Sequence, residues 1–169
     1  EYKDNHKFFV DGSPMTGDVD MGTGTQDPQD PNYNPNYQPD WRTLLVGTMG
    51  LGGKGYFVLD VTNPTTAAGS APAFVEASAG NLVKLDRTRN VEDTAPDCVT
   101  NLNTAQKAAC NKAVAEDADI GHITARPVID EADPMRSSQI TRLNNNRWAV
   151  VMGNGYNSKN QRPVLLIQY

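Results

Sequence analysis

Residues 41–61 read WRTLLVGTMGLGGKGYFVLDV, and in this stretch two apolar runs flank a turn that is rich in glycine. The runs, at 42–49 and 56–61, are short and contain β-branched and aromatic residues, which is typical of strands. Glycine adopts positive φ angles at little cost, so residues 50–55 predict a hairpin loop. The stretch therefore predicts two antiparallel strands.

A similar arrangement recurs near the end of the printed sequence. Residues 147–153, RWAVVMG, correspond to residues 41–47, and PVLLIQY at 163–169 corresponds to YFVLDV. Upstream, RPVI at 126–129 is the counterpart of SPM near the start. We predict a first unit with strands at 13–21, 42–49, 56–61 and 73–77, and a second unit with strands at 126–129, 147–153 and 163–169.

Self-similarity of this kind indicates a repeat architecture, and four-stranded units are typical of β-propeller blades. The predicted fold class is all-β: antiparallel β-propeller blades, about two blades of a larger propeller, with a short helical insertion. Blades bury their apolar faces against neighbouring blades, and natural propellers usually have about four to eight of them. We therefore expect this segment to pack against the other blades of the same propeller.

Two segments depart from the strand pattern. Residues 22–40, GTGTQDPQDPNYNPNYQPD, have no periodicity and are rich in proline, so we expect an exposed loop. Residues 103–116, NTAQKAACNKAVAE, contain good helix formers behind a potential cap at Asn103. These features predict three parts: residues 1–80 as the first blade, 81–117 as an insertion with a helix near 103–116, and 118–169 as a second, incomplete blade.

Composition excludes two classes of protein. The chain has 15 basic and 20 acidic residues, a net charge of −5, and no clustered basic face, so a nucleic-acid partner is not expected. The apolar runs are far shorter than the roughly 20 residues that span a bilayer. No stretch has the pattern of a signal peptide, and the sequence opens at Glu1 without Met, so a leader is absent or lies outside this segment.

Four strings in this order, FFVDGSPMTGDV, WRTLLVGTMGLGGKGYFVLDVTNP, DIGHITARPVI and RWAVVMGNGYNS, resemble the C-terminal propeller of the PilC/PilY-type type IV pilus tip proteins. The resemblance covers roughly residues 7–65 and 118–169, and it fails over 22–40 and 85–116. It implies a non-catalytic adhesin and pilus biogenesis factor, exported through the periplasm and displayed extracellularly, at the pilus tip or outer membrane surface. The implied partners are minor pilins or the pilus tip complex, and a host surface or glycan.

The best-known site of this family is a calcium loop with alternating acidic ligands. Such a loop needs oxygen ligands at alternate positions, a glycine in the middle and a late acidic ligand. The stretch from Asp18 to Gly22 starts this way, but Thr25, Gln26 and Asp27 do not continue it. We therefore assign no metal ligand or cofactor here and expect calcium, if any, elsewhere in the full-length protein. The loop acids are more often simply solvated than metal-bound: Asp18, Asp20, Asp27, Asp30 and Asp40.

Cys98 and Cys110 are the two cysteines of the chain. The export implied by the resemblance favours a disulfide that pins the insertion, and two buried free thiols are the alternative. A zinc site is a poor interpretation, because the chain has no CxxC and both histidines are distant in sequence.

No catalytic group is predicted. His6 and His122 are interpreted as hydrogen-bonded structural residues, and Ser13 and Ser158 lack a Gly-x-Ser-x-Gly context. The glycines of 47–55 are followed by a strand, whereas a phosphate-binding loop requires a helix there.

Tyr33, Tyr37 and Trp41 are candidate surface-contact residues, because exposed aromatic side chains offer contact area at low entropic cost. The alternative is that they pack against the side of the propeller. A quinoprotein (PQQ) dehydrogenase-like propeller would carry a repeated docking motif with Thr-Gly before its Trp, which Trp41 and Trp148 lack. A carbohydrate-binding module is a third hypothesis, and it predicts glycan binding that is lost on substitution of these aromatic residues by Ala.

Overall fold

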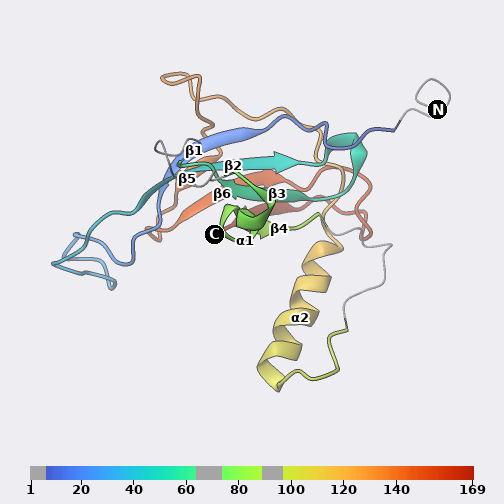
Figure 1. The fold of residues 1–169 in the computed structure, drawn as a ribbon, viewed down its shortest axis with the longest axis horizontal. Coiled ribbons are helices and arrows are strands. Elements are labelled where there is room, and N and C mark those ends of the chain that lie inside the picture. Colours follow the sequence, from blue (N-terminus) through green and yellow to red (C-terminus); the bar gives the residue numbers. More distant parts are fainter. Residues whose placement is uncertain (1–6, 64–73, 89–96) are drawn as a thin grey trace.

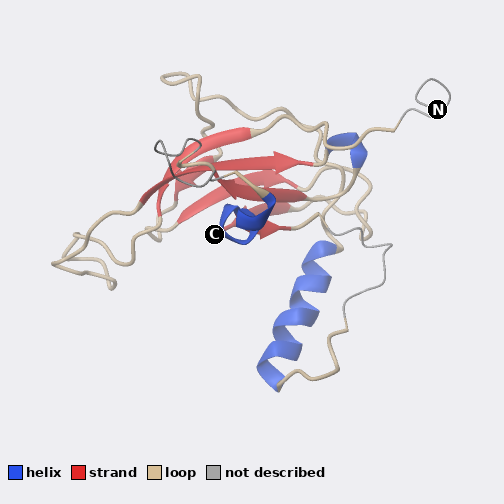
Figure 2. Cartoon of the chain, viewed as in Figure 1, coloured by secondary structure: helices blue, strands red, loops and turns tan. Residues whose placement is uncertain are grey.

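The structure is a computed structural model that describes residues 7–63, 74–88 and 97–169. Two antiparallel sheets dominate it (Figures 1 and 2). The first has the order β1-β2-β3-β4, with β1 Met15–Asp20, β2 Trp41–Thr48, β3 Tyr56–Asp60 and β4 Val83–Asp86. The second has the order β5-β6-β7, with β5 Ile140–Arg142, β6 Trp148–Gly153 and β7 Leu165–Gln168. The prediction of an all-β, antiparallel chain with a short helical insertion is confirmed.

The β2–β3 hairpin forms as the sequence predicts. Val46 pairs with Val58, and a one-turn 3₁₀ helix, η1 (Gly50–Gly52), lies in the connecting loop. The Met49 N–H donates to the Gly55 carbonyl at 3.1 Å and closes the turn. Gly55 has a φ of +121°, and a Cβ there would lie 2.1 Å from the Arg87 carbonyl oxygen, so this position requires glycine.

The fourth strand lies later in the chain than predicted. Of the predicted strand at 73–77, Ala73 lies outside the described residues. The residues that follow form a 3₁₀ turn, η2 (Glu76–Ser78), and a single helical turn, α1 (Ala79–Leu82). The edge strand is β4, a Val-Lys-Leu-Asp stretch that pairs with β3 and lies inside the range assigned to the insertion. Its alternation of apolar and charged residues is too short to stand out from the neighbouring polar sequence.

The prediction of a strand at 126–129 is also wrong. This segment forms one isolated bridge, between Ile129 and Ser137, and β5 takes the position beside β6. Pro127 has no N–H for a ladder, and the Val128 N–H donates to the Gln139 side chain at 2.8 Å instead.

The two sheets pack against each other through one apolar core. Strands β1 and β5 contact each other, and a Cβ on Gly17 would lie 3.0 Å from the Ile140 side chain, so the glycine allows their close approach. Each fully buried aliphatic side chain contributes roughly 1.5–3 kcal/mol. The core draws on both sheets and on the segment before β5: Met15, Val19, Val46, Tyr56, Val58, Ile120, Ile123, Ile140, Val150 and Met152.

At one end of the second sheet, the loop after β6 is fastened to the segment that precedes Ile120. The buried Asn154 amide donates to the carbonyl of Asp119 at 2.6 Å and to that of Arg162 at 3.0 Å, while its oxygen accepts the Val164 N–H. Gly155, at φ +74°, lies so close to His122 that a Cβ would meet its carbonyl oxygen at 2.1 Å.

The Asp119 carboxylate adds charge-assisted bonds to this junction. It accepts two hydrogen bonds from Arg162, at 2.8 and 2.6 Å, and one from the Asn160 amide at 2.7 Å. These bonds stabilise the ionised form, the Arg162 pair foremost, and lower the pKa of Asp119 to about 2. The junction therefore depends on an ionised carboxylate.

The predicted helix is present as α2 (Thr104–Asp117). Asn103 caps it and forms a capping box with Gln106, as its residue type suggests. The helix extends away from the sheets (Figure 1), and its C-terminal end is joined to them by Arg87, which pairs with Glu116 at 3.2 Å and Asp117 at 2.8 Å. In the described ranges, no helix combines the length and apolar character that crossing a bilayer requires.

Candidate interaction surface

The loop that joins β1 to β2, residues 21–40, extends beyond the end of the sheets (Figure 2). It is held by its own hydrogen bonds. Thr25 bridges to Tyr33, with the Thr25 N–H donating to Asn32 at 3.2 Å and the Asn34 N–H donating back to Thr25 at 2.8 Å. The exposed loop expected from its composition is therefore an ordered projection.

Asp30 fastens this loop to the second sheet. Its carboxylate accepts the Asn32 N–H at 2.7 Å and a short hydrogen bond from the Asn146 amide, which lies in the turn between β5 and β6. The pKa of Asp30 lies below its usual value, chiefly because of the Asn32 backbone bond and next because of the Asn146 amide. One residue of the loop thus contacts both its own turn and the neighbouring sheet.

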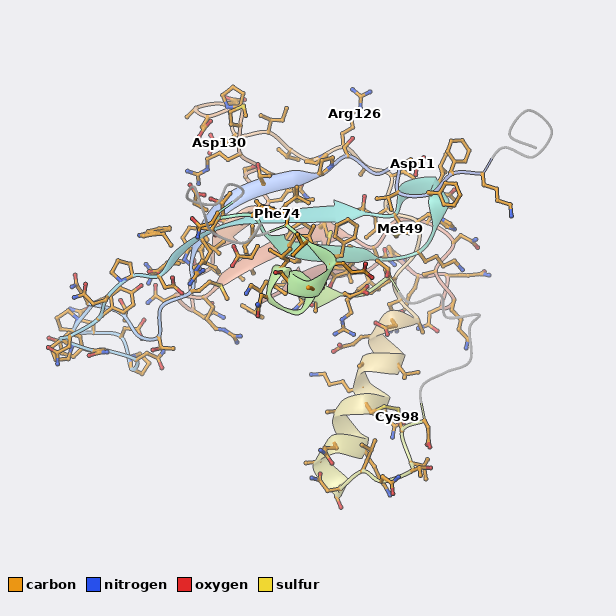
Figure 3. The ribbon with its side chains drawn as sticks, viewed as in Figure 1. Asp11, Met49, Phe74, Cys98, Arg126 and Asp130 are labelled. Carbon is orange, nitrogen blue, oxygen red and sulfur yellow. A yellow bond between two sulfur atoms is a disulfide. The ribbon has the colours of Figure 1, made fainter. Side chains whose placement is uncertain are left out.

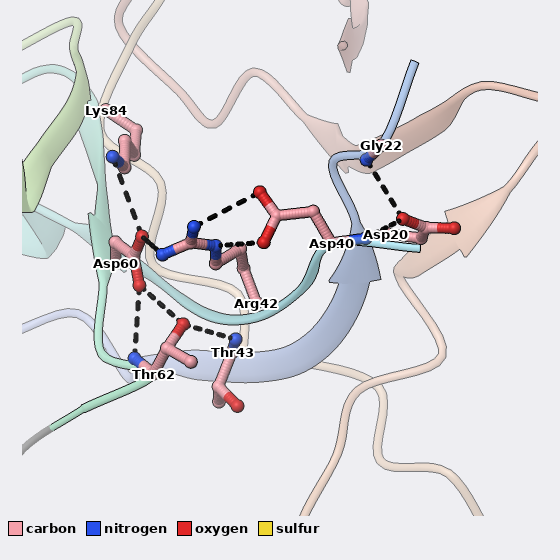
Figure 4. Close-up of polar contacts among 8 residues, drawn as sticks. All are labelled: Asp20, Gly22, Asp40, Arg42, Thr43, Asp60, Thr62 and Lys84. Atoms are coloured by element: carbon pink, nitrogen blue, oxygen red, sulfur yellow. Dashed lines mark hydrogen bonds and ion pairs between the residues drawn. The ribbon is translucent and has the colours of Figure 1, made fainter. Parts of the chain in front are cut away.

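The base of the loop is closed by hydrogen bonds between its two ends (Figure 4). Asp20, at the end of β1, accepts the N–H groups of Gly22 at 2.9 Å and Asp40 at 2.8 Å. Arg42 holds Asp40 by a bidentate pair at 2.8 and 3.1 Å. These contacts bring the two ends of the loop together.

Beside this base, Asp60 joins β3 to its neighbours (Figure 4). It accepts the Thr62 hydroxyl at 2.6 Å and lies 3.7 Å from Arg42 and 3.6 Å from Lys84. Burial alone would raise the pKa of Asp60, but the Thr62 bonds and the two cations outweigh it, and the pKa lies below its usual value. Across residues 7–63, 74–88 and 97–169, no three His, Cys, Asp or Glu side chains form a group suited to a metal ion.

The three predicted contact residues do not have equal surroundings. Tyr33 lies on the loop and is 47% exposed. Tyr37 is half-buried near the base of the loop, where a Cβ on Gly22 would lie 2.9 Å from its ring. Trp41 is 55% exposed, but its ring lies edge-on to Trp148, with centroids 5.9 Å apart. Within residues 21–40, Tyr33 is therefore more exposed than Tyr37; Trp41 is more exposed than either but packs against the second sheet.

An apolar groove of about 180 Å³ lies between the two sheets. No sequence pattern indicates this groove, because apolar strand residues that line a groove look the same in sequence as those that fill a core. Residues of β4 and β7 both line it, and Gln168 of β7 accepts the Tyr56 hydroxyl at 3.1 Å. The residues that line it come from both sheets and include Leu44, Lys84, Leu85, Trp148, Gln168 and Tyr169.

In the glycine-rich turn at 50–55, an aspartate already binds two of the backbone N–H groups that a phosphate-binding loop would offer. Asp11, which lies beside Met49 in Figure 3, accepts the N–H of Leu51 at 2.6 Å and that of Gly52 at 3.2 Å. This confirms the prediction that the glycines serve a tight turn.

His122 Nδ1 lies 2.9 Å from the Gly50 carbonyl oxygen, and its ring stacks on Tyr156. Both contacts fit the structural role predicted for this histidine. His6 lies outside the described residues.

Cys98 and Cys110 form a disulfide, with their Cα atoms 5.5 Å apart. It links the segment before α2 to the middle of that helix, away from the sheets (Figure 3). The bond therefore pins the insertion to itself and not to the sheets.

Comparison with known proteins gives relatives of one kind. The chain is 27% identical over 162 residues to the type IV pilus biogenesis factor PilY1 of Pseudomonas aeruginosa, covering 96% of this chain and 8% of that protein. A PilY1 homologue of Xylella fastidiosa is 26% identical over the same length, and another from that organism is 39% identical over 69 residues. The chain thus spans less than a tenth of the length of these relatives.

No family model matches the chain, and no solved structure matches it. The alignment with the PilY1 proteins nevertheless runs through both sheets and the segments between them. The resemblance seen in the sequence is therefore confirmed: over nearly its whole length, the chain is similar to one part of the PilY1-type type IV pilus biogenesis factors.

Proposed function

We propose that this chain is a non-catalytic scaffold within a type IV pilus biogenesis factor and adhesin. The observation that carries the proposal is the alignment of 96% of the chain with the P. aeruginosa factor. The proposal includes export through the periplasm and display at the outer membrane surface or pilus tip.

We further propose that the two sheets are adjacent blades of a β-propeller. In support, both sheets have the same order along the chain, and the first strands of each, β1 and β5, lie together. The second sheet also keeps apolar side chains exposed, with Leu165 63% and Ile167 46% accessible. In a ring, such surface is covered by the next blade. Residues 1–80 and 118–169 then hold the larger part of each blade, with β4 added to the first.

The long loop is the proposed contact region for minor pilins, the pilus tip complex, or a host surface or glycan. Its backbone is ordered by the Thr25–Tyr33 bridge and fixed to the second sheet through Asp30 and Asn146. An exposed aromatic on an ordered loop loses little entropy on binding, so Tyr33 is a suitable anchor.

The test uses the full-length protein in its own bacterium. Deleting the gene should abolish surface pili, and the wild-type copy should restore them, whereas unchanged piliation would refute the pilus role. Tyr33→Ala should keep protein abundance and reduce adhesion or binding of minor pilins. Met135→Ala, at a side chain 82% exposed on another loop, is the matched control and should leave both unchanged. Normal adhesion and pilin binding by Tyr33→Ala would refute the contact role.

A further inference from the structure

The turns that follow β2 and β6 meet at the end of the sheets opposite the long loop (Figure 1). The Gly55 N–H donates to the Gly121 carbonyl at 3.3 Å, and the backbones of His122 and Tyr156 exchange two hydrogen bonds, at 2.8 and 3.1 Å. A pocket of about 380 Å³ lies among these segments, with Met49, labelled in Figure 3, in its lining. Main-chain hydrogen bonds between the segments of the two sheets therefore fix the walls of this pocket.

The pocket is lined by the half-buried polar side chains of Lys54, Thr88 and His122 and by the exposed Asn157. A carbonyl oxygen can only accept a hydrogen bond, so the contact with Gly50 places the hydrogen of His122 on Nδ1 and leaves Nε2 of the neutral ring as an acceptor. The Thr88 hydroxyl donates to Asp86 at 2.6 Å and keeps its own lone pairs, while an asparagine amide both donates and accepts. Such a set suits a ligand rich in hydroxyl groups, because hydroxyls also donate and accept.

A second pocket, of about 540 Å³, lies in the loop after β6 and shares Asn157 with the first. Neutral polar residues line much of it, including Ser158 and Gln161. Tyr156 also lines it and is 53% exposed, and its ring is stacked on His122 with centroids 5.2 Å apart. An aromatic ring that is already held in place offers a flat apolar face at low entropic cost. A ligand of more than one ring can therefore extend from one pocket to the other.

The charges of the two pockets favour an anion. The chain has a net charge of −5, but no Asp or Glu is among the described residues that line either pocket, whereas Lys54 and Arg162 are. Arg162 is already paired with Asp119, at 2.8 and 2.6 Å, so Lys54 is the cation that can pair with a ligand. Complementary charge of this kind selects among ligands that otherwise have similar hydrogen-bonding groups.

We propose that this end of the chain binds a glycan that carries a carboxylate, with the sugar carboxylate beside Lys54 and the sugar hydroxyls bonded to His122 and Asn157. Sialic acids and uronic acids share this chemistry. A phosphate is a poorer fit, because Asp11 occupies two N–H groups of the neighbouring turn. The site lies apart from the contact region proposed on the long loop, so it is an additional binding surface.

The experiment measures binding of three probes to the purified full-length protein by isothermal titration calorimetry: sialyllactose, a disaccharide that contains glucuronic acid, and lactose as the neutral control. At least one acidic probe should bind, and the two acidic probes distinguish the sources of the carboxylate. Lactose should bind roughly tenfold more weakly or not at all, because a hydrogen bond to a charged group contributes more than one between neutral groups.

Two substitutions test the assigned residues. Lys54→Gln should weaken binding of the acidic probe roughly tenfold and leave binding of lactose unchanged, because it removes the charge alone. Asn157 has a φ of +58°, so Asn157→Gly keeps a backbone that glycine adopts readily, removes the amide and should weaken binding of the acidic probe. Lys112→Gln, at a side chain 77% exposed on α2, is the matched control and should bind as the wild type does. Thermal unfolding of each variant shows that the fold is kept.

Three results would overturn the proposal. The first is that neither acidic probe binds at millimolar concentration, and the second is that lactose binds as tightly as the acidic probes. The third is that Lys54→Gln binds the acidic probe as the wild type does. If Tyr33→Ala abolishes binding in that third case, the glycan occupies the long loop, which would support the proposed contact region and contradict the site at Lys54.

Discussion

Trp41 and Trp148 contact each other edge to face across the two sheets, with ring centroids 5.9 Å apart and planes at 75°. They stand at the first positions of β2 and β6, which are equivalent strands of the two repeat units, although the alignment of the units matches Trp41 with Arg147. Arg147, next to Trp148, lies over the ring of Tyr169 at 4.0 Å. The repeat therefore brings its own two tryptophans together and places them beside the groove and the base of the long loop.

This pair should contribute to stability as a coupled unit. Aromatic pairs of this geometry contribute about 0.5–1.5 kcal/mol beyond the area they bury. In urea unfolding followed by circular dichroism, a double-mutant cycle of Trp41→Ala and Trp148→Ala should give a coupling energy in that range. Trp148→Ala alone should be the more destabilising single change, because Trp148 is less exposed and lines the groove. Strictly additive effects would show that the rings do not interact.

Asp119 should make stability depend on acid pH. Its pKa is about 2 in the folded chain and about 3.9 in an unfolded one, so its contribution is present in full above pH 4 and is lost as the pH falls from about 4 to 2. Thermal unfolding between pH 6 and 2 should show a steeper acid loss for the wild type than for Asp119→Asn.

Glu131→Gln is the control for that experiment, because Glu131 is an exposed acid elsewhere on the surface. It should keep the wild-type slope. Equal slopes for the wild type and Asp119→Asn would mean that the Arg162 and Asn160 bonds do not stabilise the folded state.

Gly155 and Gly153 provide a matched pair of substitutions. At Gly155 an alanine would have to keep a φ of +74° and lie 2.1 Å from the His122 carbonyl oxygen, whereas at Gly153 a Cβ meets nothing within 4 Å. Gly155→Ala should therefore lower the free energy of unfolding by more than about 2 kcal/mol, whereas Gly153→Ala should leave it unchanged or raise it slightly. Chemical denaturation measures both. Similar stabilities for the two variants would contradict the geometry of the Asn154–His122 junction.

Removing the disulfide should have a local effect. A disulfide that closes a loop of this length stabilises the folded state by about 3 kcal/mol, because it lowers the conformational entropy of the unfolded chain. This disulfide lies within the insertion. In Cys98→Ser/Cys110→Ser, hydrogen exchange should become faster in α2 and stay unchanged in β6. Equal acceleration in both would show that the insertion supports the sheets.

Some elements could be read from the sequence because their residues act locally. Asn103 caps α2 through Gln106 three positions later, and the glycines after β2 permit a turn of their own. β6 and β7 are predictable because each is an apolar run close to Gly, Asn or Pro. Such signals depend only on neighbours along the chain.

Other elements depend on contacts between distant residues. β5 has three residues and is a strand because Ile140 pairs with Val150, and β4 exists because β3 offers it an edge. The hydrogen bond from Asn146 to Asp30 joins residues 116 positions apart. Likewise, the groove arises only when two sheets meet, so no single stretch of sequence indicates it.

The central claim is that these residues are adjacent blades of a larger ring within a longer pilus protein. Limited proteolysis of the full-length protein, with the resistant domain isolated under native conditions and weighed by mass spectrometry, tests it most directly. The account predicts a resistant domain that contains β1 to β7 and extends well beyond the 18.4 kDa of this segment. Release of a stable monomer that ends near Tyr169 and binds no apolar dye would contradict it.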